Sequence, residues 1–239
     1  MGAVTVLLVR GICMASLAHI TNDALRVLTF RKPSPDIASS WRAYLTFGLA
    51  FTWIAGVGRY WDSPRAELWQ HLGFGSLAYV FVLALIIWGL LIPLRPARWS
   101  YRTVLIFITF TSPPAVLYAI PVERFMSLEA AQEANVWFLG VVATWRVALL
   151  AWFLRSIARL PAVSIVVATL LPLTLIVVTL TILNLEHVVF NIMAGIKPED
   201  RSPNDAAYMA VMGMAYFSIM AAPFLLMAYA WIAYRARTA

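Results

Sequence analysis

The chain consists of long apolar blocks separated by short segments that carry most of its charged residues and turn-forming prolines. The blocks show neither a helical nor a strand period, and most are close to the roughly 20 residues that an α-helix needs to cross a bilayer. We therefore predict an all-α fold, a polytopic integral membrane helical bundle with six transmembrane helices and an N-terminal interfacial helix. The six blocks are about residues 43–58, 72–93, 103–121, 136–154, 160–185 and 206–234, within a single membrane domain covering residues 1–239.

The first block is the shortest, and Arg42 and Arg59 at its ends are expected to snorkel outward. Residues 1–35 precede it and are too polar for a span. Their modest apolar face consists of Ala24, Leu25, Val27 and Leu28. This pattern predicts a helix lying at the membrane interface, although a helix packed against the bundle fits it equally well.

Composition agrees with a membrane protein, because 62% of the residues are hydrophobic and 12% are charged, against about 25% charged residues in soluble domains. Cys13 is the only cysteine, which excludes an intramolecular disulfide and a dithiol redox pair.

The positive charges are distributed unevenly along the chain. Twelve of the eighteen Lys and Arg residues fall in the N-terminal segment, the second and fourth loops and the C-terminus, and five fall in the other loops. The positive-inside rule therefore predicts cytoplasmic N- and C-termini. We expect the membrane to be the inner (plasma) membrane of a bacterium. The net charge of +7 is then a topology signal, and we expect no nucleic-acid partner.

Arg146 lies near the middle of the fourth block, where an arginine costs roughly 2.5–3.5 kcal/mol to insert. It should face the bundle interior, with Glu123 or Glu186 as the counter-charge. One interpretation is a binding site for an anionic substrate or a lipid headgroup, or a gating ion pair. The other, which we favour from the sequence, is a structural Arg–Glu bridge.

The third block is broken by prolines, among them Pro113 and Pro114. They remove two backbone donors and free carbonyls of the preceding turn, which transporters use to bind ions. More often such a break is a kink satisfied by nearby hydroxyls, here Thr109, Thr111 and Ser112. We favour the kink.

Motifs for catalysis are missing: the sequence has no Walker motif, no nucleophile elbow and no His/Cys metal spacing, so we expect no enzyme activity, no metal and no cofactor. Glu186 and His187 could form an acid–base pair, but neighbours on a helix point about 100° apart. An enzyme would need Glu123, Arg146, Glu186 and His187 to converge on one cavity.

Two patterns lie in a distinctive order, Ser112-Pro113 followed by Ile120-Pro121, and then Trp145-Arg146 followed by Arg155. With the N-terminal segment and five apolar blocks, they make residues 20–185 resemble the bacterial branch of the Yip (Ypt-interacting protein) family. The resemblance implies a compact helical bundle without catalytic activity, associated with membrane organisation or partner binding. The Asp-Leu-Tyr-Gly-Pro motif of the eukaryotic members is missing here, so Rab-type partner binding is not implied.

Together these features predict a non-enzymatic scaffold or accessory subunit of a membrane assembly. Its expected partners are the lipid bilayer and a membrane protein or a second copy of the chain. The alternative is a small transporter or channel for an anionic solute or lipid, which would use Arg146 and the broken third block.

Overall fold

The computed structural model describes residues 17–34, 40–61, 68–185 and 206–238, and within them it contains helices and no strand. In chain order the α-helices are a helix over residues 17–28, α2 (Trp41–Gly58), α3 (Leu68–His71), α4 (Phe74–Leu91), α5 (Tyr101–Phe110), α6 (Leu128–Ser156), α7 (Ala162–Ile182) and α9 (Ala206–Thr238). The 3₁₀ helices η2 (Ile92–Leu94), η3 (Pro113–Ala119) and η4 (Val122–Arg124) lie between them. The predicted all-α class is confirmed.

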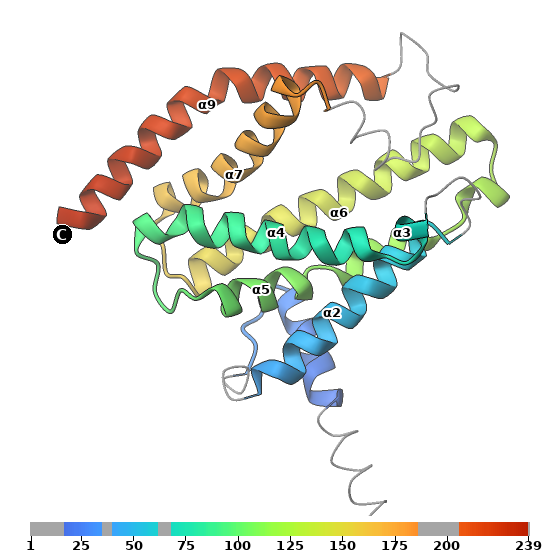
Figure 1. Cartoon of the computed structure of the whole chain (residues 1–239), viewed down its shortest axis with the longest axis horizontal. Coiled ribbons are helices and arrows are strands. Elements are labelled where there is room, and N and C mark those ends of the chain that lie inside the picture. The colour runs from blue at the N-terminus through green and yellow to red at the C-terminus, as the bar shows by residue number, and fades with distance from the viewer. Residues whose placement is uncertain (1–16, 35–39, 62–67, 186–205, 239) are drawn as a thin grey trace, which may run out of the picture.

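The central helix of the bundle is α4 (Figure 1). It packs against α2, α5 and α7, while α6 packs against α7 and η3, and α9 packs mainly against α7. A buried apolar core joins α5 and α6, where the rings of Phe107 and Phe153 stack with their centroids 4.0 Å apart. The α4–α5 and α6–α7 connections lie at the same end of the bundle as the C-terminus, and α3 lies at the other end (Figure 1).

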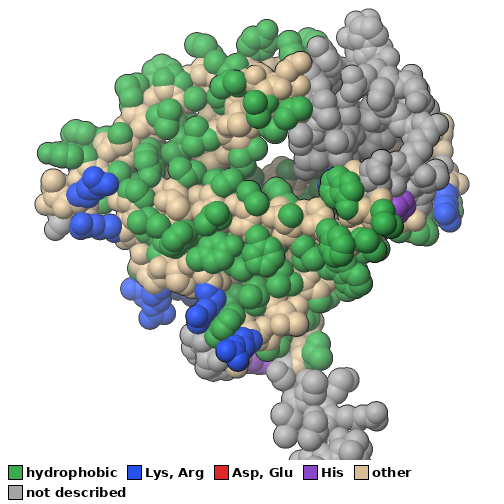
Figure 2. Space-filling model, viewed as in Figure 1, with side chains coloured by type: hydrophobic (Ala, Val, Ile, Leu, Met, Phe, Trp, Pro, Cys, Tyr) green, Lys and Arg blue, Asp and Glu red, His purple; other side chains and the backbone are tan. Residues whose placement is uncertain are grey.

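Four segments are long and apolar enough to cross a membrane, namely Phe74–Leu94, Glu133–Ser156, Ala162–Ile182 and Met209–Thr238. The α5–η3 pair makes a fifth if it is one broken span. Hydrophobic side chains cover much of the face seen in Figure 2, as expected of a surface that meets lipid. The membrane class agrees with the prediction, but the total of six spans is not reached, because α2 starts with Trp41 and Arg42 and is less apolar.

The third block breaks where its prolines predict. Helix α5 ends at Phe110, η3 begins at Pro113, and the two are bent by 40°. The hydroxyls of Thr109 and Thr111 donate to the carbonyls of Ile106 and Ile108 over 2.8 and 2.7 Å. The 40° bend at the prolines agrees with the predicted kink. The two hydroxyls do not bond the carbonyls of Thr109 and Phe110, which the prolines leave without an i+4 amide.

The helix over residues 17–28 packs against the bundle, which was the alternative to a purely interfacial helix. Its buried residues are Ile20, Asp23, Ala24 and Val27. The predicted apolar face was therefore partly wrong, since Leu25 is 56% exposed and Asp23 is buried instead. The indole N–H of Trp145 donates to the carbonyl of Leu28 over 3.1 Å, so the helix is also held by α6.

Asp23 is at the centre of a polar cluster at this contact. Its carboxylate accepts hydrogen bonds from the Tyr44 hydroxyl at 2.7 Å and from the Ser34 backbone N–H and hydroxyl at 3.0 and 2.5 Å. His19 and Arg26 lie 3.8 and 4.0 Å from the same carboxylate. Burial by itself raises the pKa of Asp23, but the hydrogen bonds from Ser34 and Tyr44 outweigh burial and hold that pKa below its usual value.

Candidate functional site

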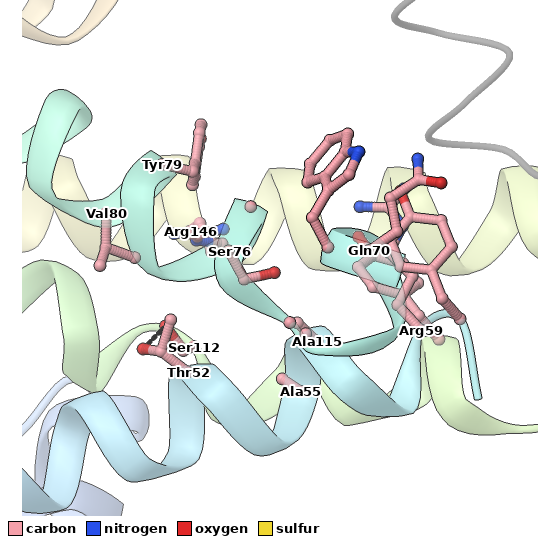
Figure 3. Close-up of a pocket in the computed structure, with 16 residues that line it drawn as sticks. Thr52, Ala55, Arg59, Gln70, Ser76, Tyr79, Val80, Ser112, Ala115 and Arg146 are labelled. Atoms are coloured by element: carbon pink, nitrogen blue, oxygen red, sulfur yellow. Dashed lines mark hydrogen bonds between the residues drawn. The ribbon is translucent and has the colours of Figure 1, made fainter. Parts of the chain in front are cut away.

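A cavity of about 340 Å³ opens between α2, α3, α4, η3 and α6 (Figure 3). We call it the polar cavity, because two arginines, four aromatic side chains with a polar atom and several hydroxyls line it: Arg59, Arg146, Tyr60, Trp69, Tyr79, Tyr118, Thr52, Ser76 and Ser112. Its volume is at the lower end of the range of small-molecule sites, about 300–1,000 Å³. None of the described residues that line it is Asp or Glu.

Arg146 enters the polar cavity from the middle of α6, as expected for a charge that must avoid lipid. Its Nε donates to the hydroxyl oxygen of Thr111 over 3.3 Å, and its guanidinium carbon lies 5.6 Å from the ring centroid of Tyr79. Its Nη2 is buried and has no hydrogen-bond partner. Within the described part of the chain, no carboxylate pairs with Arg146, so its charge is held only by neutral groups.

Arg59 is a second cationic residue of the polar cavity. It follows α2 directly, and its side chain lines the cavity, a position that the expected outward snorkelling did not indicate. The guanidinium lies 5.0 Å from the ring centroid of Tyr118 and 5.6 Å from that of Tyr60. Cation–π attraction to two rings explains why the side chain turns toward the bundle. In Figure 3, Arg59 and Gln70 lie toward one end of the cavity and Arg146 and Tyr79 toward the other.

Small residues allow the cavity walls to approach each other closely. A Cβ atom on Gly56 would lie 2.7 Å from the Ser76 hydroxyl oxygen, so α2 and α4 could not keep their spacing with a larger residue there. Gly73 has a φ of +68°, which lets the chain turn from α3 into α4. Across the cavity, the Thr52 hydroxyl donates to the Ser112 hydroxyl over 2.8 Å and so joins α2 to the start of η3 (Figure 3).

A second, smaller cavity of about 160 Å³ lies between α4, α5, α6 and α7. We call it the apolar cavity, because most of its lining residues are aliphatic or aromatic, such as Ile87, Val142 and Leu150. Tyr79, Tyr118 and Arg146 line both cavities, so the two meet at the arginine.

The other residues proposed from the sequence are only partly placed. Pro113 and Pro114 start η3, which contributes Ala115 and Tyr118 to the polar cavity. The backbone of Glu123 lies in η4, but its side chain is outside what the structure describes. Glu186 and His187 also lie outside the described residues, so the predicted Arg–Glu bridge and the acid–base pair stay predictions.

The described residues contain no group of three or more His, Cys, Asp or Glu side chains that could hold a metal ion. Comparison of the chain with protein-family models, with curated protein sequences and with solved structures gives no match. The resemblance to the Yip family therefore stays a prediction from the sequence.

Proposed function

We propose that this chain is an integral membrane protein that binds an anionic group in the polar cavity, and that it acts as a small transporter for an anionic solute or lipid. The observation that carries the proposal is the environment of the Arg146 guanidinium. Its guanidinium lines a cavity, keeps a buried Nη2 without a hydrogen bond, and pairs with no carboxylate among the described residues.

An anion with several oxygens fits this arrangement chemically. A guanidinium group donates hydrogen bonds in a planar fork that matches a carboxylate or a phosphate, and such charge-assisted bonds are about twice as strong as neutral ones. Arg59 adds a second positive charge in the same cavity, and the hydroxyls of Ser76 and Tyr118 line the space beside the two arginines. An anion at Arg146 would balance the charge of that guanidinium.

The broken third segment gives the cavity a wall that can move. This wall is formed by η3, which is a short 3₁₀ helix and not part of a continuous α-helix. Two residues separate it from the end of α5. A bend at a helix break is a common place for transport-related motion because the backbone is already interrupted there. This supports transport in preference to static binding.

We propose that the protein lies in a bacterial inner membrane with both termini on the cytoplasmic side. In this topology α2 also crosses the membrane, which brings the total to six spans. The arrangement in Figure 1 supports this, because the arginine-bearing α4–α5 and α6–α7 connections and the C-terminus share one end of the bundle. Most of the Lys and Arg side chains visible in Figure 2 lie toward that end. The polar cavity includes α3, which is at the opposite end, so we propose that it opens to the outer side.

The scaffold or accessory-subunit function predicted from the sequence is the competing proposal. It requires Arg146 to serve as a structural bridge, for which Glu123 and Glu186 are the candidate partners. The two proposals differ in what happens when the arginine is removed, because a scaffold needs Arg146 only for folding and a transporter needs it for its ligand.

The test uses the full chain purified in mild detergent and reconstituted in liposomes. Binding and uptake of labelled inorganic phosphate are measured for wild type, Arg146→Leu and Arg155→Leu; Arg155 is a matched control on α6 that does not line the polar cavity. We expect Arg146→Leu to lose binding by about 10- to 100-fold, the range for one hydrogen bond to a charged group, and Arg155→Leu to keep it. Unchanged binding and uptake in folded Arg146→Leu would refute the proposal.

A second arm separates the two sources of the anion. The phosphorus content of the purified protein is measured after extraction from membranes, and again after washing with lipid-free detergent. Stoichiometric phospholipid that is present in wild type and absent in Arg146→Leu identifies a lipid headgroup as the ligand. Arg146-dependent uptake of free phosphate identifies a soluble anion.

A further inference from the structure

We propose that the ligand is an amphiphile, whose anionic headgroup binds in the polar cavity and whose apolar chain binds in the apolar cavity. This inference rests on the proposed function, since the headgroup is the anion bound at Arg146. It adds the chemical class of the ligand, which a cationic cavity on its own does not define.

The first observation is that the two cavities adjoin and share three lining residues. Arg146 lines both, together with Tyr79 and Tyr118, and the three residues come from α6, α4 and η3. A molecule whose charged end contacts the arginine in the polar cavity therefore has its other end next to the apolar cavity. A small hydrophilic anion would occupy only the first of the two spaces.

The second observation is the chemistry of the apolar cavity. Beyond the three shared residues, its described lining is aliphatic or aromatic except for Thr111. The hydroxyl of Thr111 donates to the carbonyl of Ile108 and accepts from Nε of Arg146, so it is already engaged on both sides. The space has little to offer water or an ion and suits a hydrocarbon chain.

The third observation is where the apolar cavity lies. It lies between four helices, α4, α5, α6 and α7, of which α4, α6 and α7 are long and apolar enough to cross a membrane. A hydrocarbon chain placed there would gain van der Waals contacts with the aliphatic and aromatic lining.

The experiment measures how affinity depends on chain length. Binding of methyl, butyl and octyl phosphate to the full-length protein is measured in one fixed detergent. Each additional buried methylene should tighten binding about fourfold, the factor that corresponds to ~0.8 kcal/mol per methylene, until the cavity is full.

Two variants place the chain in the apolar cavity. Val142 is buried and lines that cavity, whereas its neighbour Val141 on α6 is 48% exposed and lines neither. Val142→Phe should remove the dependence on chain length, whereas Val141→Phe should keep it as in wild type. If Val142→Phe does not fold, Ala143→Leu, a milder change at another lining position, is measured in its place.

The possible results distinguish a failure of the amphiphile proposal from a failure of the proposed function. Arg146-dependent binding with similar affinity for all three phosphates would overturn the amphiphile and leave the proposed function standing. A chain-length series that survives in folded Val142→Phe or Ala143→Leu would also overturn it, because the chain would then bind elsewhere. Binding of every phosphate that is unaffected by Arg146→Leu would overturn the proposed function itself.

Discussion

Replacing Asp23 with alanine should destabilise the protein strongly, because one buried carboxylate holds the N-terminal helix to α2. The substitution removes three hydrogen bonds, two from Ser34 and one from the hydroxyl of Tyr44, which is 1% exposed. Hydrogen bonds to charged groups contribute about 1.5–3 kcal/mol each, but bonds that share one acceptor are not additive. We expect a total loss of about 3 kcal/mol, or about 6–12 °C in Tm for a chain of this size.

The assay is thermal unfolding of the full chain in detergent, followed by tryptophan fluorescence. Two tryptophans report on this contact directly, since Trp145 hydrogen-bonds the Leu28 carbonyl and Trp152 lies edge-on to Phe30 with centroids 6.5 Å apart. Asn22→Ala is the matched control, because Asn22 is the exposed neighbour of Asp23 on the same helix. An Asp23→Ala protein that unfolds within about 1 °C of Asn22→Ala would show that the cluster does not hold the helix in place.

Two further outcomes can be measured with the same assay. Since the pKa of Asp23 is lower in the folded than in the unfolded state, its stabilising effect is complete above the unfolded value of about 4 and is lost as the pH falls through the folded value. Asp23→Asn should flatten this acid limb of the stability curve, and an identical limb in wild type and variant would contradict the assignment. Gly48→Ala should destabilise by about 1–3 kcal/mol, because the new Cβ would overlap the buried Thr109 side chain, whose Cβ would be only 2.6 Å away. Gly89→Ala should instead stabilise the protein by about 0.5–1 kcal/mol, because no heavy atom lies within 4 Å of the added Cβ. Equal effects of the two substitutions would rule out a close contact of α2 with α5.

The helices could be predicted from the sequence because the signal for them is local. A long apolar block must satisfy its backbone internally and therefore forms a helix wherever it is placed. The break before Pro113 was predictable for the same reason, since a proline lacks the amide proton whatever its neighbours are. Whether α2 crosses the membrane was harder to predict. Arg42 and the glycines of α2 lower the mean hydropathy of the helix to near the value that separates a membrane span from a packed helix.

The contacts that build the site are not local, and this is why the sequence did not show that Arg59 lines the polar cavity. An arginine at the end of an apolar block usually reaches for water, and nothing near Arg59 in the sequence shows that Tyr118 will lie beside it in space. The adjacent Tyr60 was a possible signal, since it offered a cation–π partner.

The contacts of Arg146 explain how a charge can persist inside the bundle without a carboxylate. Insertion of an arginine costs roughly 2.5–3.5 kcal/mol, a hydrogen bond from it to Thr111 contributes about 1.5–3 kcal/mol, and the ring of Tyr79 adds about 0.5–2 kcal/mol. These neutral groups offset the insertion cost, and among the described residues no carboxylate neutralises the positive charge. A leucine at this position would avoid the cost altogether and could pack against the same helices. This comparison supports the proposal that Arg146 binds an anion.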